Sequence, residues 1–192
     1  FVFGEAITVV GGLESSISSF ENSSDRSVDE RILGAYVNFY YRPVEPLLLE
    51  AGGRYDENIE FDGDFAWNVG ATYTLSESGT RFHARASEAY RNPSLLDSEF
   101  FPSIFSNQLA NPDLQSEQIL GWETGVTQQL GDHEISATYY QQALEDAIVT
   151  SFPAAGTSQR VNQAGMSSVS GLEIAASGKL GSNHLSYRMA FT

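Results

Sequence analysis

The sequence lacks cysteine and long apolar runs. With no cysteine among 192 residues, it can form neither a disulfide framework nor a metal site with thiolate ligands. Its longest aliphatic cluster, Leu47 to Leu49, is interrupted at once by Glu50. No segment approaches the roughly 18 consecutive apolar residues of a membrane helix. A helical membrane protein is therefore excluded.

Basic residues are scarce too. The chain has 10 Lys and Arg against 25 Asp and Glu, a formal net charge of -15. Because binding to phosphates requires a basic face, we expect no nucleic-acid partner. The sequence contains no Gly-x-Ser-x-Gly elbow, phosphate-binding loop or His-Glu-x-x-His helix, and its three histidines are not at metal-ligand spacing. We expect no enzyme, no bound metal and no cofactor.

The chain does contain repeated alternation of apolar and polar residues with period two. In the clearest stretch, Phe65 to Leu75, the odd-numbered residues are apolar or aromatic and the even-numbered ones are small or polar. Such a strand has one face suited to lipid and one suited to water. Strands of soluble sandwiches are usually about five or six residues long, whereas a tilted strand that crosses a bilayer needs about nine to eleven. The length predicts transmembrane strands.

Short turns and long loops alternate between these segments. The turns are rich in Pro, Gly, Asp and Ser, and the predicted long loops are Glu14 to Asp29, Glu57 to Gly63, Arg91 to Ser116 and Val149 to Gln159. This asymmetry is typical of outer-membrane barrels. We expect strands at Phe1 to Leu13, Glu30 to Tyr41, Glu45 to Asp56, Asp64 to Leu75, Thr80 to Tyr90, Glu117 to Leu130, His133 to Ile148, Arg160 to Gly178 and Asn183 to Phe191.

The predicted fold is all-β, an antiparallel transmembrane β-barrel of which this chain forms a part with about nine strands. Bacterial single-chain barrels close with an even number of strands, so we expect the first and last strands to pair with segments outside this sequence. An Arg on the lipid face costs about 2–4 kcal/mol near the midplane. The ionisable residues predicted to face the lumen instead are Glu50, Arg54, Arg81, His83, Arg85 and Glu173.

An ordered set of motifs resembles the C-terminal barrel region of TonB-dependent outer-membrane receptors. The set begins with Tyr90-Arg91-Asn92-Pro93-Ser94-Leu95-Leu96 and continues, after a loop, with Asn111-Pro112-Asp113-Leu114-Gln115-Ser116-Glu117 and Trp122-Glu123-Thr124-Gly125. Val161 to Ala164, Gly171 to Glu173 and Gly53 to Asp56 extend the resemblance over nearly the whole chain. The family motif then comprises Arg91, Pro93, Asn111, Pro112, Leu114, Glu117, Glu123 and Gly125.

The resemblance implies a function. Such receptors carry scarce solutes, commonly ferric siderophores, haem, cobalamin or certain sugars, through a barrel of about 22 strands filled by an N-terminal plug. Their partners are the TonB energy-coupling complex, a small-molecule or metal-chelate ligand and the lipid of a Gram-negative outer membrane. Neither a plug nor a TonB box is found in this sequence, and we expect residues 1–192 to belong entirely to the barrel.

The roles of several residues have two interpretations. Arg91, Pro93, Asn111 and Pro112 either organise the barrel rim, as proline and asparagine often do in turns, or touch ligand. Lumen-facing arginines either steer anionic chelates or pair with the plug and the wall. Apolar residues in the long loop either pack on neighbouring loops or contact a flat ligand. The candidate ligand-binding residues are Tyr90, Arg91, Phe100, Phe101 and Phe105.

Three functions remain open from the sequence. A TonB-linked receptor requires the inner-membrane energy source and binds one solute tightly. A passive porin-type barrel without a plug passes many small solutes by diffusion. A soluble all-β binding module purifies without detergent.

Overall fold

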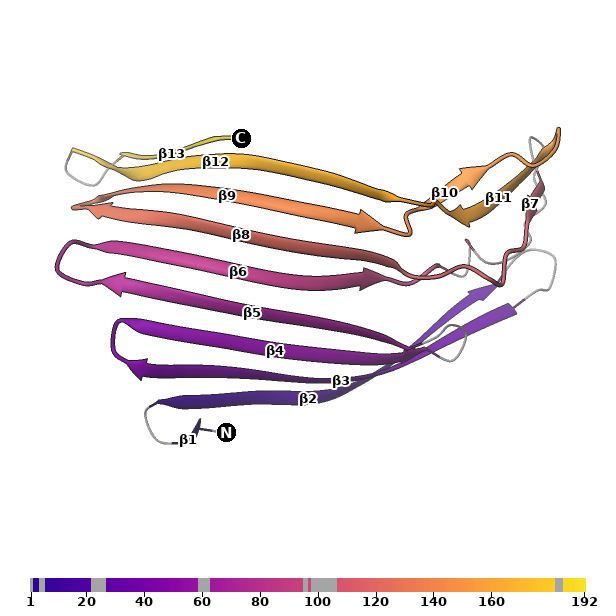
Figure 1. The fold of residues 1–192 in the computed structure, drawn as a ribbon, viewed down its shortest axis with the longest axis horizontal. Coiled ribbons are helices and arrows are strands. Elements are labelled where there is room, and N and C mark those ends of the chain that lie inside the picture. Colours follow the sequence, from indigo (N-terminus) through magenta and orange to yellow (C-terminus); the bar gives the residue numbers. More distant parts are fainter. Residues whose placement is uncertain are drawn as a thin grey trace.

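The computed structural model describes residues 2–3, 6–21, 27–58, 63–94, 97, 107–181 and 185–192. Ten strands form one antiparallel sheet, in which all neighbours except β6–β8 and β9–β12 are consecutive strands (Figure 1). None of the described residues belongs to a helix long and apolar enough to cross a membrane. In sheet order the strands are β1 Val2–Phe3, β2 Ile7–Glu21, β3 Ser27–Val44, β4 Leu47–Asn58, β5 Asp64–Leu75, β6 Thr80–Arg91, β8 Glu117–Leu130, β9 His133–Glu145, β12 Met166–Leu180 and β13 Leu185–Phe191.

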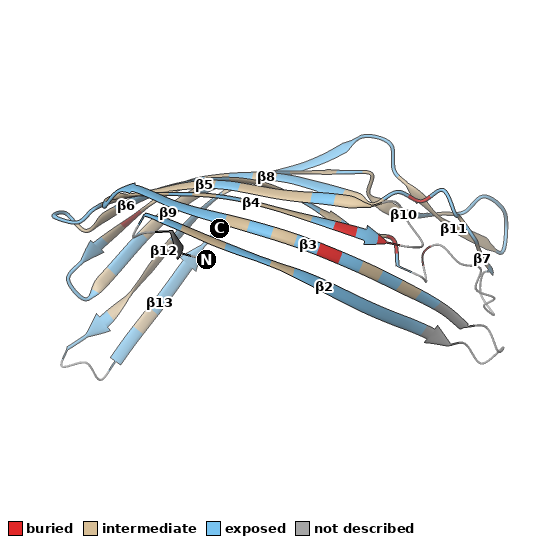
Figure 2. Ribbon diagram, turned by 90° about the horizontal axis from the view of Figure 1, so that it is seen from below, coloured by how far each residue is buried: buried red, intermediate tan, exposed pale blue. Residues whose placement is uncertain are grey.

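A second, small sheet lies beyond one end of the large one (Figures 1 and 2). It joins the hairpin of β10 (Ile148–Ser151) and β11 (Thr157–Asn162) to β7 (Asn107–Leu109). Strand β11 pairs with β7 in parallel. The end of the large sheet that carries this small sheet is called the mouth below, and the opposite end is the turn end.

The large sheet bends into an arch (Figure 2). In the described residues, β1 and β13 are its two edge strands. The prediction of a partial antiparallel barrel with about nine long strands is therefore confirmed, since only the two-residue β1 is added to them.

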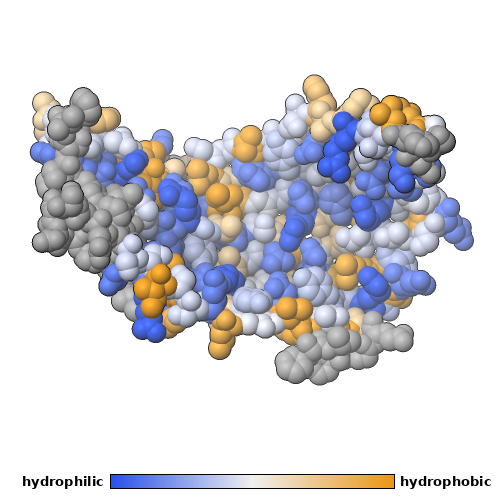
Figure 3. Space-filling model, turned by 180° about the vertical axis from the view of Figure 1, so that it is seen from behind, coloured by the Kyte–Doolittle hydropathy of each residue, from blue (hydrophilic) through white to orange (hydrophobic). Residues whose placement is uncertain are grey.

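The register separates two faces. On β5, Val69 pairs with Ala51 on one side and Ala86 on the other. The next residue, Gly70, pairs with Glu50 and Arg85. Apolar side chains thus share the outer, convex face and polar ones share the inner face, as the alternation predicts. Hydrophilic side chains predominate over the middle of the hollow side of the arch (Figure 3).

The turns at the turn end have the chemistry that tight hairpins need. Gly79 has φ 69° and Gly131 has φ 61°, a left-handed conformation that glycine adopts without steric cost. Gly79 also closes its turn by donating its N–H to the carbonyl of Leu75 at 2.9 Å. These short connections fix the register of the long strands.

Several predicted boundaries are wrong. Most of the predicted loop Glu14 to Asp29 is strand, because β2 and β3 pair from Ile7 opposite Tyr41 up to Glu21 opposite Ser27. This extension is rich in serine, so it has no apolar alternation by which it could be recognised. The predicted strand Arg160 to Gly178 is split at residues 163–165, where Gly165 has φ 101°.

Two of the other predicted loops contain strands as well. The segment Val149 to Gln159 contributes to the β10–β11 hairpin, and Arg91 to Ser116 contains β7. These strands are short and lack a buried face, so backbone pairing alone defines them. Strand β9 correspondingly ends at Glu145 rather than at Ile148.

Buried residues are few and concentrate near the mouth. Pro93 is almost completely buried, and Leu114 is the buried hydrophobic residue of the described chain. Asp56, Asn58 and Asp97 are buried polar residues of the same region. Away from the mouth Thr127 is buried, but the described residues there include no buried hydrophobic side chain, and the wall exposes one apolar face and one polar face.

Candidate functional site at the mouth of the barrel

The centre of the mouth is an ion pair between two adjacent strands. Arg91, the last residue of β6, pairs with Glu117, the first residue of β8. The Arg91 Nε donates to Glu117 Oε2 at 2.6 Å, and the backbone N–H of Ile148 donates to Glu117 Oε1 at 2.6 Å. Glu117 thereby connects the wall to the base of the β10–β11 hairpin.

The environment of Glu117 favours its charged form. The hydrogen bond from Arg91 has the largest effect and lowers the pKa of the Glu117 carboxyl; burial opposes it with the next largest effect, and the bond from Ile148 lowers the pKa further. The outward apolar residues of β8 run from Leu120 to Leu130, so Glu117 lies beyond the part of the strand that is suited to lipid.

Asp97 is a second carboxylate with several partners. Its Oδ2 accepts hydrogen bonds from the backbone N–H of Ser94 at 3.0 Å and from the Ser94 hydroxyl at 2.7 Å. Its Oδ1 lies 3.3 Å from the Nε of Arg160 on β11, and Arg91 Nη1 lies 3.9 Å from Oδ2. Asp97 therefore bridges the end of β6 and the outer hairpin.

Two asparagines join the loop segments. Asn111 Nδ2 donates to the carbonyl of Arg160 at 2.7 Å. Asn162 accepts the N–H of Gln115 at 2.8 Å and donates to the carbonyl of Gln115 at 2.8 Å and that of Asp146 at 2.7 Å. An asparagine amide supplies donor and acceptor at once, which explains the use of this residue between two backbones.

The proline motifs lie within the same arrangement. Pro93 follows Arg91 and is almost completely buried, whereas Pro112 is exposed in the turn that follows Asn111. Leu114 is buried two residues later. The predicted motif residues Arg91, Pro93, Asn111, Leu114 and Glu117 are thus brought together at the mouth, where their contacts are with other protein groups.

A second polar network lies beside the mouth. Arg54 donates to Asp56 Oδ2 at 2.7 Å and to Glu14 Oε2 at 2.9 Å, and the Tyr90 hydroxyl donates to Asp56 Oδ2. Asp56 lies over Gly34 of the neighbouring strand. A Cβ at Gly34 would overlap Asp56 Oδ1 and come within 2.7 Å of Arg54 Nη2. The network therefore requires glycine at position 34, because Asp56 and Arg54 occupy the space that a larger side chain would need.

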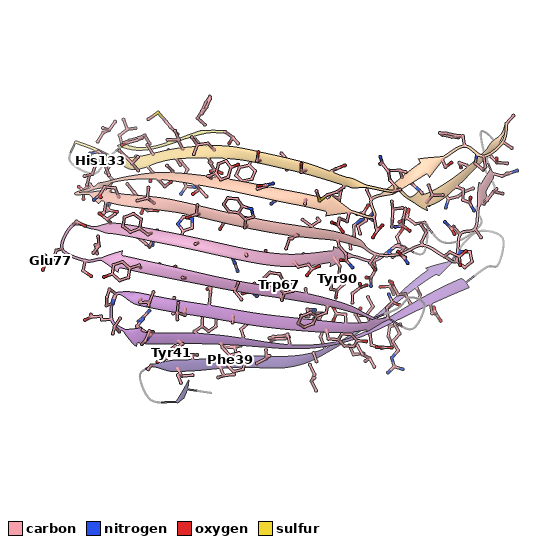
Figure 4. All side chains as sticks on the ribbon, viewed as in Figure 1. Phe39, Tyr41, Trp67, Glu77, Tyr90 and His133 are labelled. Atoms are coloured by element: carbon pink, nitrogen blue, oxygen red, sulfur yellow. The ribbon has the colours of Figure 1, made fainter. Side chains whose placement is uncertain are left out.

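The five candidate ligand-binding residues fall into two groups. Tyr90 and Arg91 use their polar atoms in the contacts just described. Tyr90 lies toward the mouth, at the opposite end of the sheet from His133 and Glu77 (Figure 4). Phe100, Phe101 and Phe105 lie outside the residues that the structure describes.

The predicted lumen-facing residues follow the inner register. Arg85 pairs with Glu123 across β6 and β8, and its Nε lies 3.7 Å from Glu50 Oε1. His83 lies over Gly125, where a Cβ would come within 2.5 Å of the imidazole. Arg81 and Glu173 occupy inner positions opposite Thr127 and Thr138. These charges line the hollow side of the arch at several depths.

Not every ionisable side chain in the wall faces inward. Glu88 pairs with Trp67 on the outer face, and the Trp67 indole Nε1 donates to Glu88 Oε2 at 2.5 Å. Both side chains are half-buried. An indole is suited to the interface between lipid and water, where it can satisfy a polar neighbour.

Sequence reasoning missed Asp97, Arg160 and Asn162 as members of the mouth. One local signal was available for Asp97, because Ser94-x-x-Asp97 has the spacing of a capping box and makes one of its two contacts, the Ser94 N–H donating to Asp97 Oδ2. No local signal pairs Arg160 with Asp97. Within the described residues, no group of three or more His, Asp or Glu side chains is placed to hold a metal ion.

The long alternating strands, the arch and the polar inner face define the wall of a β-barrel. The sequence model of one protein family, described as the TonB-dependent receptor-like β-barrel, matches residues 4–192 of this chain. The chain belongs to this family. A comparison with curated protein sequences gave no match.

Solved structures share the fold at low sequence identity. The siderophore receptor PirA from Pseudomonas aeruginosa superposes with a TM-score of 0.84 at 20% identity, covering 98% of this chain and 38% of that one. A variant of the ferric enterobactin receptor PfeA from the same species, in complex with enterobactin, gives 0.80 at 15% identity with 94% and 32% covered. The FrpB iron transporter from Neisseria meningitidis gives 0.74 at 16%, with 94% and 32% covered. This chain spans about a third of the length of these structures.

Proposed function

We propose that this chain is part of the wall and mouth of a TonB-dependent outer-membrane receptor that takes up a scarce solute such as a ferric siderophore or cobalamin. The observation that carries the proposal is the match of a receptor-barrel family over residues 4–192. The structural neighbours named for siderophores, enterobactin and iron transport favour an iron chelate within this range. Transport itself is not enzymatic.

The geometry of the mouth supports a receptor rather than a passive pore. Two outer connections fold into an ordered sheet fastened to the wall through Asp97, Glu117 and Asn162. A porin that admits many small solutes has no need of such a built entrance. Because Tyr90 and Arg91 are engaged in wall contacts, we propose that they organise the mouth and that solute contact falls to other parts of the loops, including Phe100, Phe101 and Phe105.

The inner face carries a row of charged side chains on β6. Arg81, His83 and Arg85 follow one another on the lumen side of β6, with Glu50 as a nearby carboxylate. We propose that these residues pair with acidic groups of a plug contributed by the complete receptor. In this arrangement the apolar outer face contacts the lipid of a Gram-negative outer membrane.

An uptake assay tests the proposal. The complete gene that encodes this chain is expressed in a Gram-negative host without its own siderophore receptors, in paired strains with and without TonB. Uptake of radioactive iron is measured with a ferric catecholate and a ferric hydroxamate, and radiolabelled cobalamin is tested in parallel. Saturable uptake of one solute only in the TonB-containing strain is expected. Equal uptake of many small solutes in both strains would instead identify a passive pore.

A further inference from the structure

Arg54 reaches across one strand to a carboxylate on the next. It lies on β4 an even number of residues from Glu50, so both have the register of the polar inner face. Its Nη1 donates to Oε2 of Glu14 on β2 at 2.9 Å, and its Nε donates to Oδ2 of Asp56 at 2.7 Å. Gly34 of β3 pairs with Glu14 on one side and with Asp56 on the other. Two carboxylates from different strands therefore share one guanidinium.

The two carboxylates differ in exposure. Asp56 is 7% exposed and also accepts the Tyr90 hydroxyl, so it belongs to the structure of the wall. The side chain of Glu14 is 57% exposed, and that of Arg54 is 36% exposed. Two carboxylates and one guanidinium leave a net negative charge where the group meets the lumen. Glu14 is the member whose charge can be removed without creating a cavity.

The other arginines of the mouth are engaged in the same way. Arg91 Nε donates to Glu117 at 2.6 Å, and Arg160 Nε lies 3.3 Å from Asp97 Oδ1. In each case a carboxylate occupies an edge of the guanidinium that could otherwise bind an anionic ligand through paired hydrogen bonds. Arg31 is the remaining described arginine near this end, and it has the register of the outer face.

Acidic residues outnumber basic ones at this end of the chain. From Asp56 to Asp64 the sequence has five Asp and Glu and neither Lys nor Arg. In sequence, the parts of the mouth connections that the structure does not describe have four acidic residues and one basic residue, Arg26; these parts are residues 22–26, 59–62, 95–96 and 98–106. Taken together, these connections therefore add no surplus of cations to the mouth.

A mouth of this charge discriminates between classes of ferric chelate. A ferric tris-hydroxamate is neutral, because its singly charged ligand groups balance the charge of Fe³⁺. In a ferric tris-catecholate the doubly charged ligand groups exceed that charge and leave an anion. Like charges slow the diffusional approach of a ligand and disfavour the wrong partner. This repulsion is strongest at low ionic strength and is screened beyond about 8 Å at physiological salt.

Resting on the function proposed above, we propose that Glu14 determines specificity by occupying Arg54, and that the preferred solute is a neutral or cationic ferric chelate of the hydroxamate type. With Glu14 in place, the Arg54 guanidinium meets the lumen already paired, and the surplus carboxylate repels an anionic chelate. Without the charge of Glu14, the exposed edge of Arg54 becomes a binding group for catecholate oxygens.

Equilibrium binding to the complete receptor in lipid nanodiscs tests this inference. The probes are a neutral ferric tris-hydroxamate, an anionic ferric tris-catecholate and cobalamin. In the unchanged receptor the hydroxamate should bind most tightly, and added salt should strengthen only the binding of the catecholate. Glu14→Gln should raise the affinity for the catecholate several-fold at low salt and leave that for the hydroxamate unchanged. Glu77→Gln is the matched control, since it makes the same substitution at an exposed position at the opposite end of the sheet from Tyr90 (Figure 4).

Two kinds of result would overturn the inference and leave the proposed receptor function intact. The first is tighter binding of the catecholate than of the hydroxamate, or binding of cobalamin alone, because the mouth would then not select a ferric chelate by its charge. The second is a Glu14→Gln variant in which both chelates change by the same factor or neither changes, because Glu14 would then not discriminate between them. A receptor that binds none of the three solutes would contradict the proposed function itself, and the inference with it.

Discussion

Arg91 and Glu117 lie directly opposite each other on β6 and β8, with Nε 2.6 Å from Oε2, although 26 positions separate them in the sequence. The loop that connects them leaves and re-enters the wall at this one ion pair. Its geometry links the local sequence motifs to the architecture of the mouth.

Replacing Arg91 by Ala should lower the stability of the mouth by about 1–3 kcal/mol, because a largely buried carboxylate loses its charged hydrogen-bond partner. Thermal unfolding of the complete receptor in detergent measures the change. Arg42→Ala, which removes an exposed arginine near the turn end, serves as the control. Equal stability of the two variants would show that the Arg91 contact contributes nothing.

Acidification should loosen the same contact. The folded-state pKa of Glu117 lies below the ordinary value, so its stabilising contribution is present above the unfolded pKa of about 4.3 and is lost as pH falls through the folded value. Hydrogen exchange at Ile148, corrected for its intrinsic pH dependence, should therefore reveal more opening below about pH 4 than at pH 7. In Glu117→Gln this extra opening should vanish; its persistence would assign the effect to another group.

Gly34→Ala should destabilise the inner network. The added methyl group overlaps Asp56 and crowds Arg54, and overpacking of this kind typically costs about 1–3 kcal/mol. Urea unfolding provides the measurement. Gly121→Ala is the matched control, since its new Cβ meets its nearest neighbour at an ordinary 3.4 Å. A Gly34 variant as stable as the control would mean that Asp56 and Arg54 can move aside without loss.

A charged residue introduced on the outer face should destabilise the barrel more than the same residue on the inner face. Val69→Arg should destabilise the barrel by about 2–4 kcal/mol if this residue lies near the bilayer midplane, whereas Thr72→Arg on the inner face of the same strand should cost much less. Folding titrations into lipid vesicles compare the two. Spin labels at Val37, Val69 and Ile174 should report hydrocarbon surroundings, and water-like surroundings at all three would remove the membrane assignment.

The sequence predicted the wall well because the wall obeys a local rule. Each residue of β5 reports its own face through its polarity, so Val69 and Gly70 could be assigned without knowledge of their neighbours. Strand segments whose two faces do not differ in polarity were missed. The serine-rich second half of β2, from Glu14 onward, was therefore predicted as loop. Boundaries set by backbone pairing alone cannot be recognised from side-chain polarity.

The mouth was predictable only in part. Pro93 and Asn111 indicate turn geometry in their own sequence surroundings, and the family resemblance drew attention to them. The pairing of Asp97 with Arg160 spans two different connections, and nothing in either segment specifies the other. Long-range polar contacts of this kind depend on how the loops fold back over the strand ends.

The location of the buried residues inverts the usual distribution of mutational tolerance. In a globular domain the middle is the least tolerant region and the periphery accepts change. Here the described mid-wall positions lie on one apolar and one polar face with no packed layer behind them, so an exchange such as Val for Leu on the apolar face needs only to keep the polarity of that face. The mouth, where Pro93 and Leu114 are buried, should be the least permissive region, and random mutagenesis should find its strongest folding defects there.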